Sequence, residues 1–347
     1  MPDVVVVGAG IVGASVAYHL AKRGGVPVTL VEQGAGPAVG VTAESFGWVS
    51  GVGDGAPAGA RDLRAYVLAD HLRLAAELAG AAVRRSGSLT WGGGPVEREA
   101  PLGPGRFRVG RDEIAVLEPG LRNPPDEAVH MPDDLGVDAP ATTRALVEAA
   151  RARGATVLYR TGATSLRVRG GRVGGVLTST GFHAAETVVL TAGTSIPRLC
   201  APLPVDLPVA ASPATLVRVS APPGLVRTIV ARPDFEVREV RGGELLLPLA
   251  HAEGQVSASE QAAYGALRRL RATFRGSDGC RLLGYRAVNR PMPARGPLIG
   301  FATRDRSVYV AVMHSAVTLA PTVGRLVADE IVTGRAVPEL RRYRVRT

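Results

Sequence analysis

Three glycines follow the first apolar run of this sequence at a spacing suited to binding phosphate. The run VVVV covers residues 4–7, and Gly8, Gly10 and Gly13 come directly after it. Gly8 would let the chain turn sharply out of a strand. Gly10 would let a pyrophosphate approach the backbone, and Gly13 would let the following helix pack closely. The N-terminus of that helix would present N–H groups and a positive dipole to the phosphates.

The segments around these glycines supply the expected context. Apolar residues recur at helical spacing over residues 11–20, and residues 28–31 form a second apolar run that ends at Glu32. A carboxylate there would accept hydrogen bonds from ribose hydroxyls and repel a 2′-phosphate. This strand–helix–strand context predicts a dinucleotide site. Its residues would be Gly8, Gly10, Ile11, Val12, Gly13, Glu32 and Gln33.

The motif does not by itself decide between NAD and FAD. An NAD dehydrogenase would continue as regular strand–helix units, whereas residues 34–51 (GAGPAVGVTAESFGWVSG) show no helical period. A loop of this kind suits an elongated ligand that lies along the sheet. The run VVLTAG at residues 188–193 predicts another strand end with small residues near such a ligand.

A second candidate segment lies near the other end of the chain. Residues 308–324 (VYVAVMHSAVTLAPTVG) begin as an apolar strand, reach His314 and Ser315, and continue with small residues into a helical pattern. The strand would deliver the polar pair to a ligand, and the helix would point its N-terminus at it. A partly buried histidine beside a helix cap is an equally good interpretation of this stretch alone.

Composition and charge narrow the possible classes of protein function. The chain has 347 residues, 46% of them hydrophobic, which suggests two domains. Its net charge is +10, but Lys22 is the only lysine and the arginines are scattered along the chain. No nucleic-acid-binding motif is apparent, so a solvated basic surface is favoured over a nucleic-acid partner. A basic binding module remains as an alternative class.

The sequence also lacks motifs for disulfides, metal binding, membrane insertion and secretion. Two cysteines without a C-x-x-C pair argue against a disulfide framework or a metal site. The sequence has no apolar run long enough to span a membrane and no signal peptide, so we expect a cytoplasmic protein. Neither the oligomeric state nor the substrate can be read from the sequence.

The pattern of expected elements predicts an α/β protein. Strand–helix units at residues 3–32, 141–160 and 308–333 would build one Rossmann-like sheet, and the proline-rich and strand-rich pieces between them would form a smaller β-rich (α+β) substrate domain. The dinucleotide-binding domain is thus expected to be discontinuous. We assign it residues 1–88, 138–205 and 281–347, and the substrate domain residues 89–137 and 206–280.

Four motifs in order along the chain resemble a known family. TAESFGW at 42–48, VVLTAG at 188–193, GYRAVNRPMPARGPLIG at 284–300 and the closing VYVAVMHSAVTLAPTVG are similar to those of the FAD-dependent amino-acid and amine oxidases. That family includes glycine oxidase, D-amino-acid oxidase and monomeric sarcosine oxidase. The resemblance covers the whole chain and implies FAD as the cofactor. An NAD-dependent dehydrogenase thereby becomes the less favoured reading.

The resemblance also implies which residues contact the flavin cofactor. We expect non-covalent FAD, because residues 289–291 contain no cysteine where some relatives anchor the flavin. In this family the helix after the closing strand faces the flavin edge on which negative charge collects on reduction. The implied contacts are Thr42, Ala43, Ser45, Gly47, Trp48, Ala163 or Thr164, Ala192, Gly193, His314, Ser315, Ala316, Val317 and Thr318.

The substrate residues come from the same resemblance. Arg286 matches the family arginine that grips a substrate carboxylate, although Ala287 follows it where the family often has proline. Tyr285 and His314 would hydrogen-bond substrate or flavin, and Phe235 would line the pocket. The implied reaction is oxidation of an amino-acid or amine C–N bond to an imine, with O2 or another acceptor reoxidising the flavin. The alternative substrate is a 2-hydroxy acid or a biosynthetic intermediate.

Overall fold

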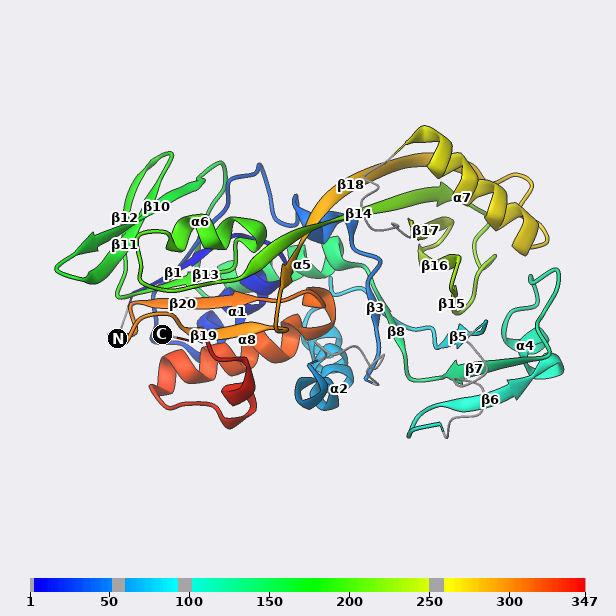
Figure 1. Cartoon of the computed structure of the whole chain (residues 1–347), viewed down its shortest axis with the longest axis horizontal. Coiled ribbons are helices and arrows are strands. Elements are labelled where there is room, and N and C mark those ends of the chain that lie inside the picture. The colour runs from blue at the N-terminus through cyan, green and yellow to red at the C-terminus, as the bar shows by residue number, and fades with distance from the viewer. Residues whose placement is uncertain (1–2, 52–59, 93–101, 250–258, 347) are drawn as a thin grey trace.

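The computed structural model describes residues 3–51, 60–92, 102–249 and 259–346. Figure 1 shows one body of sheets and helices that contains both chain ends, and a second body built around another sheet. The long strands β14 (Val209–Ser220) and β18 (Arg281–Pro293) connect the two bodies. The fold is therefore α/β with a second, β-rich part, as the sequence predicts.

A six-stranded sheet forms the centre of the first body. All neighbouring strands are parallel except the β19–β20 pair at one edge, which is antiparallel. In spatial order the strands are β19 (Leu298–Phe301), β20 (Val308–Val312), β13 (Thr187–Leu190), β1 (Val4–Val7), β2 (Val28–Val31) and β9 (Thr156–Leu158). The sheet thus gathers strands from three distant parts of the chain.

Both faces of this sheet are covered, so its strands are apolar along their whole length. Val4 and Val6 of β1 pack into a cluster with the helices, whereas Val5 and Val7 pack on the opposite face. The helices are α1 (Ile11–Arg23), α2 (Arg61–Glu77), α5 (Ala139–Arg151) and α8 (Ala316–Thr333). The other face carries α6 (Ile196–Cys200) and a small sheet of β10 (Ala163–Arg169), β11 (Arg172–Thr178) and β12 (Gly181–Ala184).

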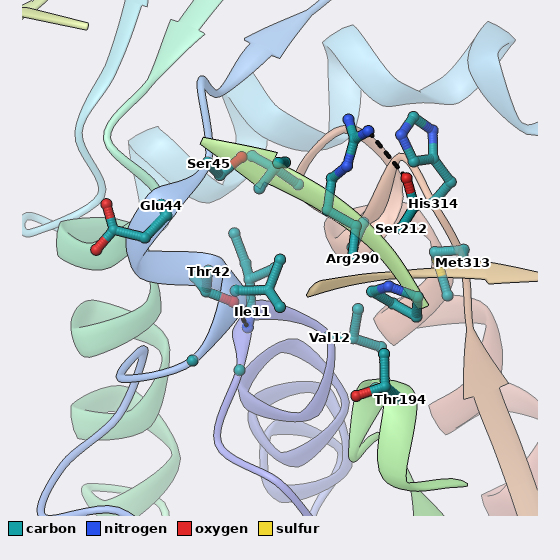
Figure 2. Close-up of a pocket in the computed structure, with 18 of the residues that line it drawn as sticks. Ile11, Val12, Thr42, Glu44, Ser45, Thr194, Ser212, Arg290, Met313 and His314 are labelled. Carbon is teal, nitrogen blue, oxygen red and sulfur yellow. Dashed lines mark hydrogen bonds between the residues drawn. The ribbon is translucent and has the colours of Figure 1, made fainter. Parts of the chain in front are cut away.

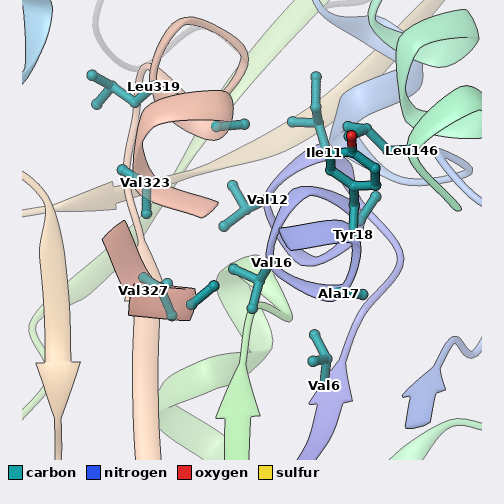
Figure 3. Close-up of a cluster of buried hydrophobic side chains, with 14 of the residues drawn as sticks. Val6, Ile11, Val12, Val16, Ala17, Tyr18, Leu146, Leu319, Val323 and Val327 are labelled. Atoms are coloured by element: carbon teal, nitrogen blue, oxygen red, sulfur yellow. The ribbon is translucent and has the colours of Figure 1, made fainter. Parts of the chain in front are cut away.

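The contact between α1 and α8 holds the two ends of the chain together. Figure 3 shows Val12 and Val16 of α1 facing Val323 and Val327 of α8 across the apolar cluster. Gly324 makes the approach so close that a Cβ there would lie 2.2 Å from Ser15 Oγ. The helix that follows the glycine loop is therefore fixed against the helix that follows the last parallel strand.

An eight-stranded sheet forms the second body. Its strands are antiparallel except for the parallel pair β15–β5. In order they are β18, β14, β17 (Glu244–Leu249), β16 (Phe235–Arg241), β15 (Ile229–Arg232), β5 (Ser88–Thr90), β7 (Glu127–Met131) and β6 (Phe107–Gly110). The helices α4 (Arg111–Leu117) and α7 (Glu260–Thr273) contribute to the apolar cluster on one face.

A second small sheet lies next to the loop that follows β2. It contains β3 (Trp48–Val49), β8 (Leu135–Val137) and β4 (Val83–Arg85), all antiparallel. The remaining short helical turns are η1 (Val41–Glu44), η2 (Gly193–Ser195) and η3 (Pro338–Tyr343). The apolar residues of 61–85 suggest one helix on sequence alone, but α2 stops at Glu77 and β4 pairs with β8.

Candidate cofactor and substrate site

A cavity of about 1130 Å³ lies between the six-stranded and eight-stranded sheets. Its wall combines the carboxyl ends of β1, β2, β13 and β20 with residues of β14, β16 and β18. Ligands of open α/β sheets bind outside the carboxyl ends of the strands. The cavity exceeds the ~300–1,000 Å³ volume range of ordinary ligand pockets. It therefore has room for a ligand longer than a typical metabolite.

Most of the residues expected from the sequence line this cavity. They are Gly8, Gly10, Ile11, Val12, Glu32, Gln33, Thr42, Ser45, Gly47, Trp48, Ala163, Ala192, Gly193, His314, Ser315, Ala316, Val317 and Thr318, and Phe235 joins them. Five expected residues do not line it: Gly13, Ala43, Thr164, Tyr285 and Arg286. Gly13 instead packs so tightly that a Cβ would lie 2.0 Å from the carbonyl oxygen of Gly8.

The glycine loop is built by backbone geometry and by one carboxylate. Gly8 has a φ of 101°, a conformation that other residues rarely adopt. The buried Glu32 accepts hydrogen bonds from the backbone N–H of Ala9 and of Gly34, each at 2.7 Å. The carboxylate therefore fixes both the loop after β1 and the turn after β2. Each oxygen retains a further lone pair for a ligand in the cavity.

The loop after β2 is tied to the sheets on either side. Thr42 Oγ1 accepts the N–H of Ile11 at the start of α1, at 3.1 Å. Trp48 donates its indole N–H to Asp134 at 2.7 Å, and its carbonyl accepts from Thr318 Oγ1 at 3.3 Å. The loop therefore bridges α1, the β3–β8 sheet and the start of α8, so the walls of the cavity are mutually fixed.

Arg238 of β16 is a site-supporting residue that the sequence did not indicate. It is 2% exposed and donates to the backbone carbonyls of Phe46 and Val137, the latter at 2.8 Å. Burial lowers the pKa of its guanidinium to about 10. The Arg238 side chain packs against Gly47, which lines the cavity. A Cβ added at Gly47 would lie 2.8 Å from Arg238 Nη2. No local pattern distinguishes Arg238 from the many other arginines.

His71 of α2 supports the helix whose N-terminus borders the cavity. Its Nε2 lies 3.1 Å from the carbonyl oxygens of both Val317 and Thr318 in the first turn of α8. Pro321, one turn later, has no N–H to donate to Val317, and a proline ring also displaces the neighbouring carbonyls. The His71 ring therefore supplies the donor that Pro321 lacks. Burial lowers its pKa to about 4, so the ring is neutral at pH 7.

Of the two arginines in this part of β18, Arg290 lines the cavity and Arg286 does not, and Arg198 and Arg232 of other elements also line it. Arg290 lines the cavity, and its Nη2 donates to Ser212 Oγ of β14 at 3.4 Å. Figure 2 shows the Arg290 side chain beside Ser212 and His314. Burial lowers the pKa of Arg290.

The side chain of Arg286 is 73% exposed, and its Nη1 lies 3.6 Å from Glu44 Oε1 beside a smaller pocket of about 260 Å³. Tyr285 packs toward the α7 side of the sheet. The difference follows from strand geometry, because four residues along β18 displace a side chain by about 13 Å. Pro291 directly follows Arg290, so the arginine–proline pair that seemed absent at Arg286 is present here. That pair was the signal that sequence reasoning passed over.

Comparison with known proteins identifies the family. A family model described as "DAO: FAD dependent oxidoreductase" matches residues 3–330. The chain belongs to this family of FAD-dependent oxidoreductases. Its cofactor is accordingly FAD.

Individual relatives are distant in sequence and close in fold. A D-amino acid dehydrogenase of Bradyrhizobium diazoefficiens is 28% identical over 234 residues, which is 64% of this chain and 55% of that protein. The chain thus spans about half the length of that relative. Glycine oxidase from Geobacillus kaustophilus is 23% identical with a TM-score of 0.85, covering 99% of this chain and 98% of that one. Iminodiacetate oxidase from Chelativorans sp. BNC1 is 23% identical with a TM-score of 0.83, covering 99% of this chain and 98% of that one.

The residues that surround the cavity fit FAD. The glycine loop and Glu32 suit a pyrophosphate and a ribose, and the long loop after β2 lines the path between α1 and α8. A Cβ added at Gly10 would meet Thr42 Oγ1 at 3.3 Å, so the loop leaves little space for a side chain there. Among the residues that the structure describes, none form a cluster of three metal-ligating side chains, and no helix there is long and apolar enough to cross a bilayer.

Proposed function

We propose that this oxidoreductase oxidises the C–N bond of an amino acid or amine to an imine, which water then hydrolyses. Arg290 carries the proposal. It is a cation in the cavity wall whose pKa is lowered by burial, and its described partner is a neutral hydroxyl. A partly buried guanidinium without an anionic partner is costly, and a substrate carboxylate would offset that cost through two parallel hydrogen bonds.

The proposed division of roles follows from the positions of the side chains. When bound, FAD accepts a hydride from the substrate carbon that bears the nitrogen. Arg290 would hold the carboxylate and so fix the orientation of that carbon. The first turn of α8, supported by His71, would present its N-terminal dipole to the negative charge that develops in the cavity. His314 borders the same end of the cavity and would contact substrate or flavin.

We further propose that the FAD is held without a covalent bond through cysteine. Cys200 and Cys280 are buried in two apolar clusters away from the described cavity wall. Burial raises the pKa of both thiols, to about 12 for Cys200. A neutral, buried thiol is a poor nucleophile. The electron acceptor is O2 or another oxidant, and comparing air with an artificial dye as acceptor would distinguish them.

The experiment that tests this function is anaerobic reduction of the flavin by matched substrate pairs. Each amino acid, in both enantiomers, is compared with the 2-hydroxy acid of the same carbon skeleton and with the amine that lacks the carboxylate. We expect the amino acid or amine to bleach the flavin absorbance and the hydroxy acid not to. Bleaching by the hydroxy acid alone would support the alternative substrate class, and bleaching by none of them would refute the proposal.

Replacing Arg290 isolates the role of the carboxylate. Removing one partner of a buried, hydrogen-bonded charge pair costs about 2–5 kcal/mol. We therefore expect Arg290→Met to lower kcat/KM for amino acids by roughly 30-fold or more, since each 1.36 kcal/mol is tenfold. Arg286→Met is the matched control, because that side chain lies outside the cavity. Equal losses in the two variants would contradict the assignment.

A further inference from the structure

Glu236 is an acidic side chain in the cavity wall to which the proposed chemistry gives no role. It lies in β16, where neighbouring residues alternate between the two faces of the sheet. Val237 packs into the apolar cluster on the α7 side, as does Phe235, which also borders the cavity at the start of the strand. Glu236 and Arg238 therefore point to the opposite face, on which Arg238 reaches Phe46 and Glu236 lines the cavity.

Strand register places Glu236 on the same face as Arg290 but far from it. Arg238 pairs with Leu246, so Glu236 stands opposite Pro248, which in turn pairs with Leu216. Arg290 pairs with Ser212, four residues further along β14. With strands about 4.8 Å apart and about 3.3 Å per residue, the two Cα atoms are roughly 15–20 Å apart along the sheet. Two opposite charges thus border the two ends of one space.

The electrostatics of Glu236 show a carboxylate that lacks a counter-charge. Burial raises its pKa, and no neighbouring group offsets that effect. The other cavity carboxylates are all satisfied. Asp234 lies 2.9 Å from Arg232 Nε, and Glu44 lies within 4 Å of two arginines. Glu32 has no ion pair but accepts two backbone N–H hydrogen bonds. Within the described part of the chain, Glu236 has neither an ion pair nor a hydrogen bond. A partly buried carboxylate in this state gains most from a cationic ligand.

We propose that Glu236 is a specificity-determining residue that binds a second, positively charged group at the far end of the substrate, and this rests on the proposed function. The α-amino group cannot be the group that it binds, because only one carbon separates that group from the carboxylate at Arg290. The preferred substrate class is therefore an amino acid with a basic side chain. A charge-assisted hydrogen bond at Glu236 would hold the side-chain ammonium or guanidinium.

Lysine and norleucine provide the test, because they share a carbon chain and differ only in the terminal amino group. Each enantiomer is assayed with the FAD-loaded wild type, Glu236→Gln and Asp234→Asn. We expect the wild type to prefer lysine. Glu236→Gln should lower the lysine-to-norleucine ratio of kcat/KM at least tenfold. Asp234→Asn removes a negative charge two residues away, but Asp234 already has Arg232 as its ion-pair partner. This variant should therefore change the lysine-to-norleucine ratio of kcat/KM less than threefold.

An inhibition measurement on the unmodified protein supplies a second readout that does not depend on any variant folding. 6-Aminohexanoate should inhibit norleucine oxidation at least tenfold more strongly than hexanoate. A wild-type preference for norleucine, or an unchanged ratio in Glu236→Gln, would overturn the assignment of Glu236 while leaving amino-acid oxidation in place. If no amino acid or amine reduces the flavin, the proposed function itself fails, and this inference fails with it.

Discussion

The contact between His71 and the first turn of α8 leads to a quantitative prediction. Replacing His71 with leucine keeps a side chain of similar size but removes the donor that serves the carbonyls of Val317 and Thr318. A buried acceptor left without a partner costs about 1–3 kcal/mol. Because one N–H is shared between two carbonyls, we expect the free energy of unfolding to fall by about 2–3 kcal/mol in total.

Urea denaturation, monitored by tryptophan fluorescence, measures this loss in the free energy of unfolding. Trp48 is a suitable probe because its carbonyl accepts a hydrogen bond from Thr318 in the affected turn. His71→Gln is the matched control, since its amide retains an N–H at nearly the position of the imidazole Nε2. We expect His71→Gln to lose less than half of what His71→Leu loses. FAD affinity should fall in the same order, because Val317 and Thr318 line the cavity.

Pro321→Ala completes a double-mutant cycle that tests the cause. Alanine at 321 restores the backbone N–H that would donate to Val317 within the helix. In the His71→Leu background it should therefore recover about 1–2 kcal/mol more than it does in the wild type. A coupling energy within about 0.5 kcal/mol of zero would mean that the two residues act independently. The explanation of His71 as the substitute donor would then be refuted.

Three other predictions follow from the same structure. Glu32→Gln leaves one of the N–H groups of Ala9 and Gly34 without an acceptor, so FAD affinity, measured by fluorescence quenching, should weaken at least tenfold. Burial lowers the folded-state pKa of His71 and His19 to about 4, so unfolded chains bind more protons between pH 6.5 and 4. The free energy of unfolding should therefore decrease as the pH is lowered from 6.5 to 4, by about 3 kcal/mol for His71. A urea midpoint that is the same at pH 7 and pH 4.5 would contradict this. Acid precipitation should release the yellow colour into the supernatant, and colour in the pellet would indicate covalent FAD.

The elements nearest to the chemistry were the easiest to predict from sequence. The glycine loop with Glu32, and the strand β20 that ends two residues before His314, are each determined by residues close together in the chain. Their geometry follows from local sterics: a glycine where φ is positive, an apolar strand before it and a helix after it. Sequence reasoning therefore located both ends of the cavity, although it could not show that α1 and α8 pack side by side.

The choice between Arg286 and Arg290 required the pairing of β14 with β18. Both arginines lie in one strand with the same parity, so alternation cannot separate them. What distinguishes them is how far along the strand each one lies from the α8 end of the cavity. The arginine–proline pair at residues 290–291 is present in the sequence, but the expectation of Arg286 rests on the tyrosine–arginine pair at residues 285–286.

The sequence by itself determined the dinucleotide-binding unit, the α/β class and the family resemblance, because these depend on spacing within short segments. Only the tertiary structure showed the contacts of His71 and Arg238, and the roles proposed for Glu236 and Arg290 rest on it as well. Each of these side chains acts on, or lies across the cavity from, residues more than 50 positions away in the chain. Such partners are brought together by strand pairing and helix packing, and no local pattern encodes which of many histidines, glutamates or arginines will be buried at the site.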